Sequence, residues 1–234
     1  MESNAFETAE GTPLTAVTAE EMAAVDRVAT ETVDLPLYSM MENAGRNLAS
    51  VVRNRRDGRP VVVLAGGGGN GGGGLACARH LLNRDVPVTV VTDRPAASTT
   101  GAAATQRRIL EAAGATVRDE APSLAGRFAV DALVGYGLTD ALDGVAADLA
   151  RACDDADGVV SLDVPSGVNA TTGAVPGAAV DADATLTLAL PKTGLGPNGG
   201  ELLLGDIGIP ASVYERLEIP YEQPFEEYVV PIRK

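Results

Sequence analysis

Residues 61–80 read VVVLAGGGGNGGGGLACARH, and this stretch decides the fold. Its apolar start predicts a buried strand, and the residues from Leu75 onward predict a helix. Eight of the nine residues from Gly66 to Gly74 are glycine, with Asn70 in the middle. Glycine takes positive φ angles at no steric cost but loses chain entropy, so such a loop indicates a very close backbone approach. A glycine loop between a strand and a helix start aims free N–H groups at one point and favours a phosphate-bearing ligand over a flexible linker.

Alternation of strands and helices marks the rest of the chain. Apolar runs predict strands at 61–65, 87–92, 128–134, 158–163, 184–190 and 202–206, and helical spacing predicts helices at 73–84, 101–114 and 144–156. This order is typical of βαβ units in a mainly parallel sheet. Two further helices precede them, one capped by Thr18 and Glu21 and one opened by Pro36. We expect a loose lead-in over residues 1–17 and one domain over 18–234, with both N-terminal helices packed on it.

Composition narrows the class of protein. The 234 residues include 18 basic and 32 acidic side chains, a net charge of −14, which argues against a nucleic-acid partner. No apolar run approaches the ~18 residues of a membrane span, and the acidic first residues lack the pattern of a secretory signal. We therefore expect a cytoplasmic protein without a membrane partner, in which Cys77 and Cys153 are free core thiols. An acidic surface with almost no lysine favours a halophilic setting.

Oxygen-bearing side chains recur at predicted strand ends. Asn70 lies in the glycine loop, Asp131 falls within an apolar strand, and Ser166 belongs to the turn Asp163-Val-Pro-Ser-Gly167. Carboxyl ends of parallel strands are where ligands bind in such sheets. The three side chains offer only hard oxygen ligands, which alkali or alkaline-earth cations prefer, and no His/Cys cluster suggests zinc. The alternative for Asp131 is a cap of the following turn, and the alternative for 163–167 is a turn without chemical importance.

Asp163 and Lys192 are the candidate reactive pair. Pro165 and Gly167 hold Asp163 and Ser166 close together at a strand end. Lys192 is the one internal lysine of a chain that otherwise uses arginine, which indicates a compact point charge or a proton donor, with chance survival as the equal alternative. The single histidine, His80, lies about two turns into a predicted helix and is expected to be structural.

Together these motifs resemble the NAD(P)H-hydrate epimerase family, the YjeF N-terminal domain. The resemblance covers about residues 18–210 and rests on short motifs in the same order: Met41-Glu-Asn-Ala-Gly45, Gly66–Leu75, Ala78–Leu81, Val130–Leu138, Asp163–Gly167, Pro191-Lys192 and Asp206–Pro210. It implies a Rossmann-like three-layer α/β/α sandwich. It also implies an isomerase that interconverts the R and S forms of hydrated NADH and NADPH at C6 of the nicotinamide ring, and it is compatible with a homodimer.

The same resemblance implies roles for individual residues. Asn70, Asp131 and Ser166 match the positions that bind K⁺, and Asp163 matches a substrate-binding position. Asp163 is also our candidate for moving the proton at the C6 hydroxyl, with Lys192 as an electrostatic aid. The remaining substrate-binding positions implied by the resemblance are Gly69, Asn70, Gly71, Gly72, Gly73, Gly135, Tyr136, Gly137, Leu138, Thr139, Asp140 and Ala141.

One motif departs from the family pattern. The family loop usually reads Asn-Asn-Gly-Gly-Asp-Gly, whereas this chain has Gly69-Asn70-Gly71-Gly72-Gly73-Gly74. Each lost hydrogen-bond partner typically costs about 1–3 kcal/mol. A non-catalytic family member that binds a nucleotide or a protein is therefore an alternative. A second alternative is an NAD-dependent oxidoreductase, because Asp93 ends the next strand where such a fold places its ribose-binding acid.

Overall fold

A single mixed sheet organises the computed structural model, which describes residues 6–196 and 199–234. The strand order is β2-β1-β10-β9-β8-β7-β6-β3-β4-β5, and all neighbours from β9 to β5 are parallel, whereas the pairs that involve β1, β2 or β10 are antiparallel. The strands are β1 (Phe6–Thr8), β2 (Pro13–Leu14), β3 (Val61–Ala65), β4 (Val88–Thr92), β5 (Thr116–Arg118), β6 (Phe128–Ala132), β7 (Val159–Leu162), β8 (Ala184–Leu188), β9 (Glu201–Gly205) and β10 (Val229–Arg233).

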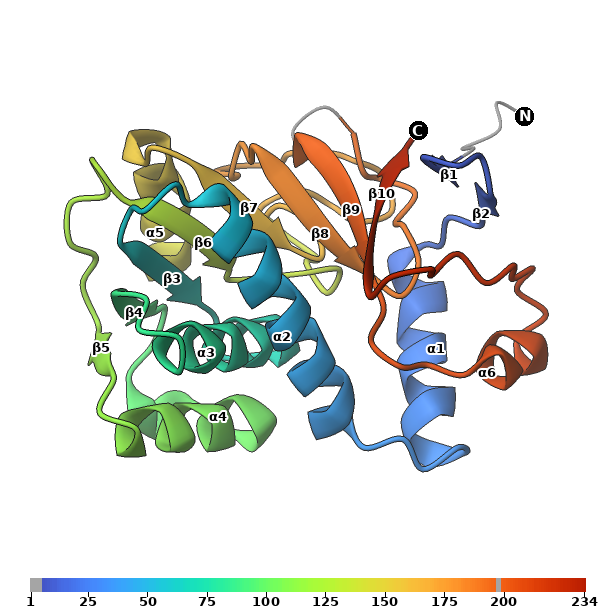
Figure 1. Ribbon diagram of the computed structural model, residues 1–234, viewed down its shortest axis with the longest axis horizontal. Coiled ribbons are helices and arrows are strands. Elements are labelled where there is room, and N and C mark those ends of the chain that lie inside the picture. The colour runs from blue at the N-terminus through green and yellow to red at the C-terminus, as the bar shows by residue number, and fades with distance from the viewer. Residues whose placement is uncertain (1–5, 197–198) are drawn as a thin grey trace.

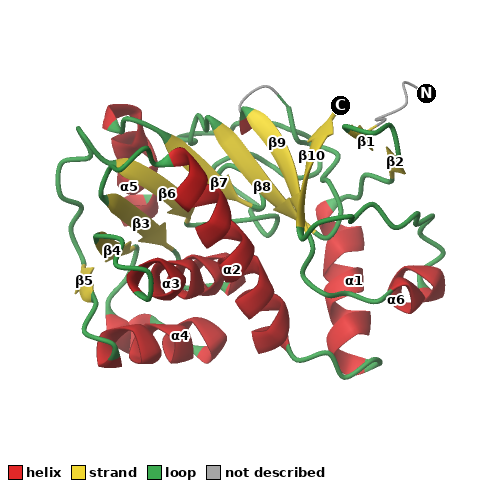
Figure 2. Ribbon diagram, viewed as in Figure 1, coloured by secondary structure: helices red, strands yellow, loops and turns green. Residues whose placement is uncertain are grey.

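Helices cover both faces of this sheet, as Figures 1 and 2 show. On one face lie α2, α3 and α4, while α5 lies on the other, and α1 and α6 stand together beside the β8–β10 end. The expected three-layer α/β/α sandwich is thus confirmed. The helices are α1 (Ala19–Glu31), α2 (Leu37–Arg55), α3 (Gly69–Leu82), α4 (Gly101–Ala112), α5 (Gly144–Ala152) and α6 (Ala211–Arg216), with short 3₁₀ turns η1 (Ala96–Ser98) and η2 (Cys153–Asp155).

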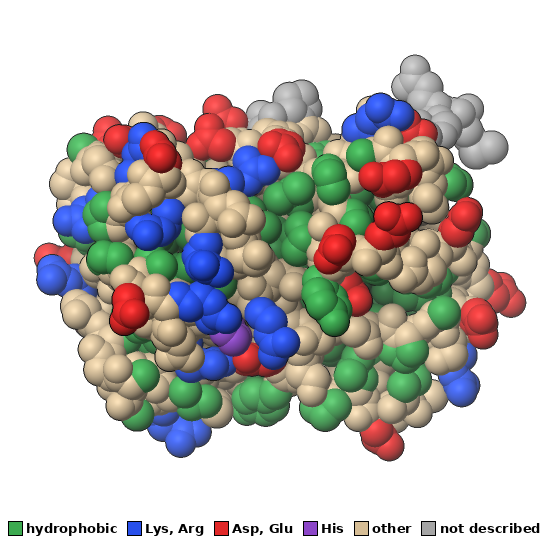
Figure 3. Space-filling model, in the orientation of Figure 1, with side chains coloured by type: hydrophobic (Ala, Val, Ile, Leu, Met, Phe, Trp, Pro, Cys, Tyr) green, Lys and Arg blue, Asp and Glu red, His purple; other side chains and the backbone are tan. Residues whose placement is uncertain are grey.

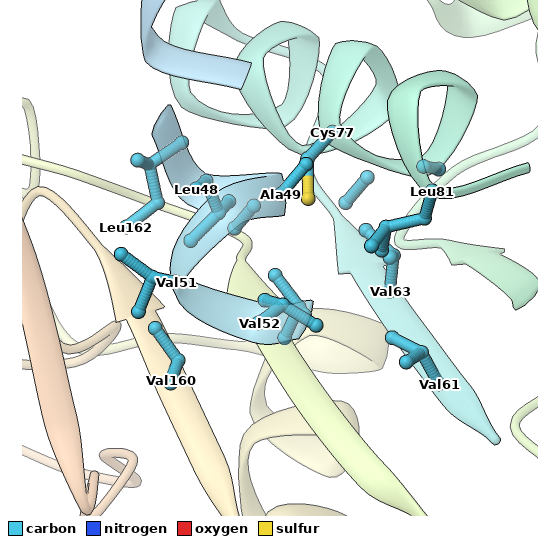
Figure 4. Packing of buried hydrophobic residues seen from close by; sticks show 14 of the residues in the cluster. Leu48, Ala49, Val51, Val52, Val61, Val63, Cys77, Leu81, Val160 and Leu162 are labelled. Carbon is cyan, nitrogen blue, oxygen red and sulfur yellow. The ribbon is translucent and has the colours of Figure 1, made fainter. Parts of the chain in front are cut away.

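Packing of aliphatic side chains holds α2 and α3 to the sheet. Leu48 and Val52 of α2 and Leu81 of α3 meet Val63 of β3 and Val160 of β7, all fully buried (Figure 4). Burying one such side chain stabilises a fold by roughly 1.5–3 kcal/mol. Cys77 lies in the same cluster and Cys153 in the cluster under α5, and both are free thiols as expected.

The glycines after β3 form a helix rather than a loop, which corrects the expectation from sequence. The cap of α3 is Gly68, so only 66–68 are loop, and the glycines of 66–74 have no positive φ angle. Close packing explains them instead. A Cβ on Gly71 would lie 1.7 Å from the carbonyl oxygen of Gly66, and one on Gly74 would lie 2.5 Å from the Cβ of Ala132. These glycines let α3 begin directly against the sheet.

The expected loose lead-in is also wrong for residues 6–17. β1 pairs with β10, β2 pairs with β1, and Phe6 is buried. Further along, the backbone of Val17 forms a parallel bridge to Lys192 through two hydrogen bonds of 2.9 and 3.0 Å. Residues 1–5 of that expected lead-in lie outside the described part. The N-terminal segment is therefore an edge of the sheet that borders the internal lysine.

Candidate active site

The strand order reverses between β3 and β6, which are neighbours although β4 and β5 lie between them in sequence. Ligands of such sheets bind outside the carboxyl ends of the strands at this switch point. A cavity of about 520 Å³ lies there, closed on one side by α1 and α2. Its size is that of a small-molecule site. The side chains that line it include Asp26, Met41, Asn70, Arg94, Tyr136, Asp163, Leu188 and Lys192.

A buried ion pair forms one wall of the cavity. Lys192 Nζ lies 2.5 Å from Asp163 Oδ1 and 2.8 Å from the carbonyl oxygen of Leu188. The other carboxylate oxygen of Asp163 accepts a 2.9 Å hydrogen bond from the backbone N–H of Tyr136. Asp163 has a φ of 71°, a left-handed conformation that Asp adopts more readily than most residues. The turn thereby aims the Asp163 carboxylate at the lysine, and the structure brings these two candidate residues into contact in the wall of one cavity.

The start of α3 forms a second wall. Gly68, Gly69 and Asn70 line the cavity, and no side chain caps the first backbone N–H groups of the helix. A helix start of this kind is an anion site. Arg94, which sequence reasoning missed, lies against Gly67: its Nε would be 2.5 Å from a Cβ there. Arg94 is the second residue after β4, directly after Asp93, so its place close to a predicted strand end is the signal that could have found it.

Asp131 and Ser166 lie together just behind the cavity wall. Ser166 Oγ is 2.5 Å from Asp131 Oδ1, and the Asp131 carboxylate also accepts hydrogen bonds from Ser161 Oγ and the Ser166 N–H. Burial raises the pKa of Asp131, while these hydrogen bonds oppose that rise. All of these partners are neutral. A monovalent cation would supply the positive charge that this fully buried carboxyl group lacks.

Asn70 lines the cavity beside Gly135, which lies in the loop that follows β6. Its Oδ1 is 3.1 Å from the point where a Cβ on Gly135 would stand, and its Nδ2 is buried without a hydrogen-bond partner. The structure thus joins Asp131 to Ser166 but shows no hydrogen bond between Asn70 and either of them within the described ranges. The carbonyl oxygen of Asn70, the Asp131 carboxylate and the Ser166 hydroxyl are all oxygen donors, and such a set fits a K⁺ site. The part of the chain described has no cluster of three His, Cys, Asp or Glu side chains suited to another metal.

The implied substrate-binding positions divide in two. Gly69, Asn70, Gly73, Gly135, Tyr136 and Gly137 line the cavity, as does Asp163. Gly71 and Gly72 are buried in α3 by packing, and Leu138, Thr139, Asp140 and Ala141 lie on the following turn, outside the cavity lining. Gly69 and Gly73 stand where the family motif has Asn and Asp, and they differ in the room available for a side chain. A Cβ on Gly69 would lie in open space, whereas a Cβ on Gly73 would be 2.8 Å from Leu162 Cδ2.

Asp26 is a second cavity residue that sequence reasoning overlooked. It lies on α1, and its Oδ2 accepts a 2.5 Å hydrogen bond from the hydroxyl of Tyr136. Burial raises the pKa of Asp26, and the hydrogen bond from Tyr136 and the charge of Lys192 partly offset that rise. Its signal was its position: Asp26 follows Met22 by four residues and precedes Ala29 by three, so it lies on the apolar face of the helix.

His80 lies away from this site, as expected for a structural residue. Its Nε2 is 2.8 Å from Glu42 Oε1 of α2, and Arg79 also pairs with Glu42. A second cavity, of about 730 Å³, is lined by His80 and the exposed arginines Arg46, Arg53 and Arg84, among others. It shares no lining residue with the first cavity. Figure 3 shows basic side chains gathered around the histidine on this face. The histidine therefore fastens α3 to α2.

A doubly wound parallel sheet with a ligand-sized cavity at its switch point defines an α/β protein of the kind that binds nucleotide-like ligands at strand ends. Residues 37–194 match the family model of the YjeF-related protein N-terminus, and the chain belongs to this family. Similarity to the crystal structure of yeast ynu0 supports the fold, with a TM-score of 0.78 at 22% identity over 93% of this chain and 100% of that one.

Relatives of established name are similar over most of the chain. A protein of Dehalogenimonas lykanthroporepellens named NAD(P)H-hydrate epimerase is 44% identical, covering 94% of this chain and 93% of its own length. One of the same name from Rhodopirellula baltica is 32% identical over 87% and 88%. The bifunctional NAD(P)H-hydrate repair enzyme Nnr of Salinibacter ruber is 36% identical over 86% of this chain, which spans 42% of that relative.

Proposed function

We propose that this protein is an NAD(P)H-hydrate epimerase, which interconverts the R and S forms of hydrated NADH and NADPH. The buried Asp163–Lys192 pair in the wall of the switch-point cavity is the observation that carries the proposal. The relative that is 44% identical over nearly the whole of both chains bears this name, which supports the same activity here. In the described part of the chain, no helix has the length and apolar character needed to cross a membrane.

Different walls of the cavity would bind different parts of the dinucleotide. The helix start at Gly68–Asn70, with Arg94 beside it, offers N–H groups and a guanidinium to the phosphates of the dinucleotide. Tyr136 and the apolar side chains of Met41 and Leu188 offer a surface for the nicotinamide ring. The hydrated ring then lies toward Asp163 and Lys192, deeper in the cavity. This arrangement holds the reacting carbon against the ion pair.

Epimerisation at C6 exchanges a hydroxyl group between the two faces of the ring. The hydroxyl leaves as water once it gains a proton, the lone pair of the ring nitrogen forms a double bond to C6, and water adds from the opposite face and loses a proton. Asp163 moves a proton in this exchange, and Lys192 fixes the orientation of Asp163 and tunes the charge around it. No net redox change occurs, so the reaction needs no hydride acceptor.

A potassium ion would be held by Asn70, Asp131 and Ser166. Its chemistry there is a fixed positive charge beside the strand ends, which favours the ionised form of Asp131 and the anionic part of the ligand. What supports K⁺ over a divalent ion is the donor set of one carboxylate, one amide and one hydroxyl.

The structure bears differently on the two alternatives, an NAD-dependent oxidoreductase and a non-catalytic family member. Asp93 is engaged at both carboxylate oxygens by Arg94, at 2.8 and 2.7 Å, so its ribose-binding role in an oxidoreductase would require breaking that pair. The non-catalytic reading has a specific observation in its favour, because Gly69 and Gly73 both lack the side chains of the family motif. A ligand of nucleotide type that is bound and not converted is therefore the second candidate.

The deciding experiment offers purified protein one isolated hydrate, R or S, in a K⁺ buffer. Chiral chromatography then follows the appearance of the other epimer over time, beside a sample without protein. Faster equilibration from both starting epimers is expected. Binding of the hydrate without faster equilibration would instead favour the non-catalytic candidate, and absence of both would reject the proposed function.

A further inference from the structure

A carboxyl group stands on the apolar face of α1 and points into the cavity. The buried neighbours of Asp26 on that face are Met22, Val25 and Ala29, all apolar. An acid in such a position costs free energy when ionised unless it is paired. Among the described residues, the hydrogen-bond partner of the Asp26 side chain is the hydroxyl of Tyr136, which is neutral. The helix therefore places a carboxyl group where a leucine would pack more easily.

Tyr136 joins this group to the ion pair across the cavity. Its hydroxyl donates to Asp26 Oδ2 at 2.5 Å, and its backbone N–H donates to Asp163 Oδ2 at 2.9 Å. The two carboxyl groups thus lie in the wall of one cavity, at opposite ends of a single tyrosine. They differ in charge environment, because Lys192 lies against Asp163 whereas Asp26 has no direct cationic partner in the described ranges. Such contrasted carboxyl pairs are how enzymes separate an acid from a base.

The charge environment of Asp26 sets which of the two keeps a proton. Burial raises the pKa of Asp26, and the negative charge of Asp163 adds to that rise. The Tyr136 hydrogen bond and the charge of Lys192 act in the opposite direction. These groups lie in the loops after β6, β7 and β8. From α6, the buried phenol of Tyr214 also faces this helix, and the charge of Asp26 adds to the rise in the pKa of Tyr214 that burial causes. Asp26 consequently holds its proton at a higher pH than an ordinary aspartic acid.

We propose that Asp26 is the proton donor to the departing C6 hydroxyl and that Asp163 accepts the proton of the incoming water. The inference rests on the proposed function. The C6–O bond breaks with its electron pair going to oxygen, which takes the Asp26 proton and leaves as water. The nitrogen lone pair forms the C=N⁺ bond, water attacks C6 on the other face, and its proton passes to Asp163. Solvent protons then restore both groups, and the reverse reaction exchanges their roles.

One carboxyl group is insufficient for this reaction, because proton donation and proton acceptance occur on opposite faces of the ring. Inversion needs a proton delivered on one face of the ring and removed on the other. Lys192 Nζ and the Tyr136 N–H both donate to the Asp163 carboxylate, so this carboxylate is held among donors and is oriented to accept rather than to deliver a proton. The protonated carboxyl group on α1 supplies the missing half, and Tyr136 holds the two at a fixed separation.

The test compares Asp26→Asn, Asp26→Glu and Tyr136→Phe with the unaltered protein in the hydrate epimerisation assay. Asparagine keeps the acceptor for the Tyr136 hydroxyl but has no proton to give. We expect kcat to fall about 100-fold or more with KM nearly unchanged, the usual size of general acid catalysis. Asp26→Glu retains a carboxyl group and should recover part of the rate. Glu31→Gln, an exposed carboxyl group at the end of the same helix, is the matched control and should behave as the unaltered protein.

The pH profile separates a proton donor from a structural residue. The rate of the unaltered protein should decline as pH rises through the folded-state pKa of Asp26, which burial raises. That decline should vanish in Asp26→Asn and move to higher pH in Tyr136→Phe, because the Tyr136 hydrogen bond lowers the pKa of Asp26. Unchanged kcat in folded Asp26→Asn, or the same decline surviving in that variant, would overturn the proposal. If the unaltered protein itself fails to epimerise the hydrate, the proposed function fails instead.

Discussion

Lys192 Nζ and Asp163 Oδ1 lie 2.5 Å apart, and the side chains of both residues are almost fully withdrawn from solvent. Two opposite charges in such a place depend on each other, because either one alone would be a buried and unpaired ion. The pair therefore links the candidate chemistry to the stability of the fold. The effects of the pair on activity and on the free energy of unfolding can be measured separately.

Replacing Asp163 with Asn should remove both activity and stability. Asn tolerates the left-handed backbone at this position, but it leaves the Lys192 charge unpaired. We expect a loss of about 3–5 kcal/mol in the free energy of unfolding, measured by urea denaturation. The double variant Asp163→Asn/Lys192→Met should recover much of that loss while staying inactive. Full stability of the single variant would show that the lysine finds another partner or loses its charge.

The two missing side chains of the glycine motif should respond differently to restoration. Gly69 is helical with open space around it, so Gly69→Asn should fold and tighten binding of the hydrate. Gly69→Ala is its control and should stabilise the helix by roughly 0.5–1 kcal/mol without tighter binding. Hydrate titration and thermal melting measure both effects. Equal affinity of the Asn and Ala variants would mean that this side chain does not reach the ligand.

Gly73→Asp should be costly, because its Cβ would be 2.8 Å from Leu162 Cδ2 in a close-packed core. We expect a lower melting temperature than in the unaltered protein. Combining it with Leu162→Val shortens the opposing side chain and should restore part of the loss. A Gly73→Asp protein that melts normally would show that Leu162 moves aside freely.

Asp26→Asn should make the protein more stable at neutral and alkaline pH. The folded state raises the pKa of this carboxyl group above its unfolded value of about 3.9, so the folded protein binds the proton more tightly. That contribution is present below the unfolded pKa and is lost as pH rises through the folded pKa. The difference in melting temperature between variant and unaltered protein should therefore increase from pH 4 to pH 8. A difference that is flat with pH would mean that Asp26 does not titrate in this range.

Potassium should stabilise the fold by binding at Asn70, Asp131 and Ser166. A ligand at 100 times its dissociation constant adds about 2.7 kcal/mol. Melting temperature should rise with K⁺ more than with choline at equal ionic strength. Asn70→Ala should weaken that response while leaving the baseline nearly intact, since the Asn70 amide has no protein partner to lose. Identical curves in the two salts would reject the site.

The βαβ pattern predicted most of the parallel sheet, because buried strands read as short apolar runs bounded by turns. The structure confirms the strand that begins at Val61 and the helix capped by Thr18 and Glu21. Strands β1, β2, β5 and β10 and helix α6 were missed. β1, β2 and β5 have two or three residues each, β10 carries Pro231 within its apolar run, and α6 has six residues. The helical state of 69–74 was missed because glycine disfavours helices locally, while packing against β3, β6 and α2 decides the matter.

Site residues at strand ends were predictable, and those from other elements were not. Asp131, Asp163 and Ser166 follow from the rule that parallel strands present their carboxyl ends at one edge. The helical spacing marks Asp26 as an acid on the apolar face of α1, but it does not reveal that α1 lies beside the cavity. The homodimer, the cytoplasmic location and the halophilic setting stay predictions.

The edge of the sheet also constrains when the protein can finish folding. β10, near the end of the chain, lies between β9 and β1, and Glu7 pairs with Arg233. Closing a loop that encompasses nearly the whole sequence is entropically slow. β1 can pair with β2 as soon as both have been synthesised, but this hairpin joins the rest of the sheet only through β10. During translation the hairpin must therefore wait for β10 before it can join the sheet.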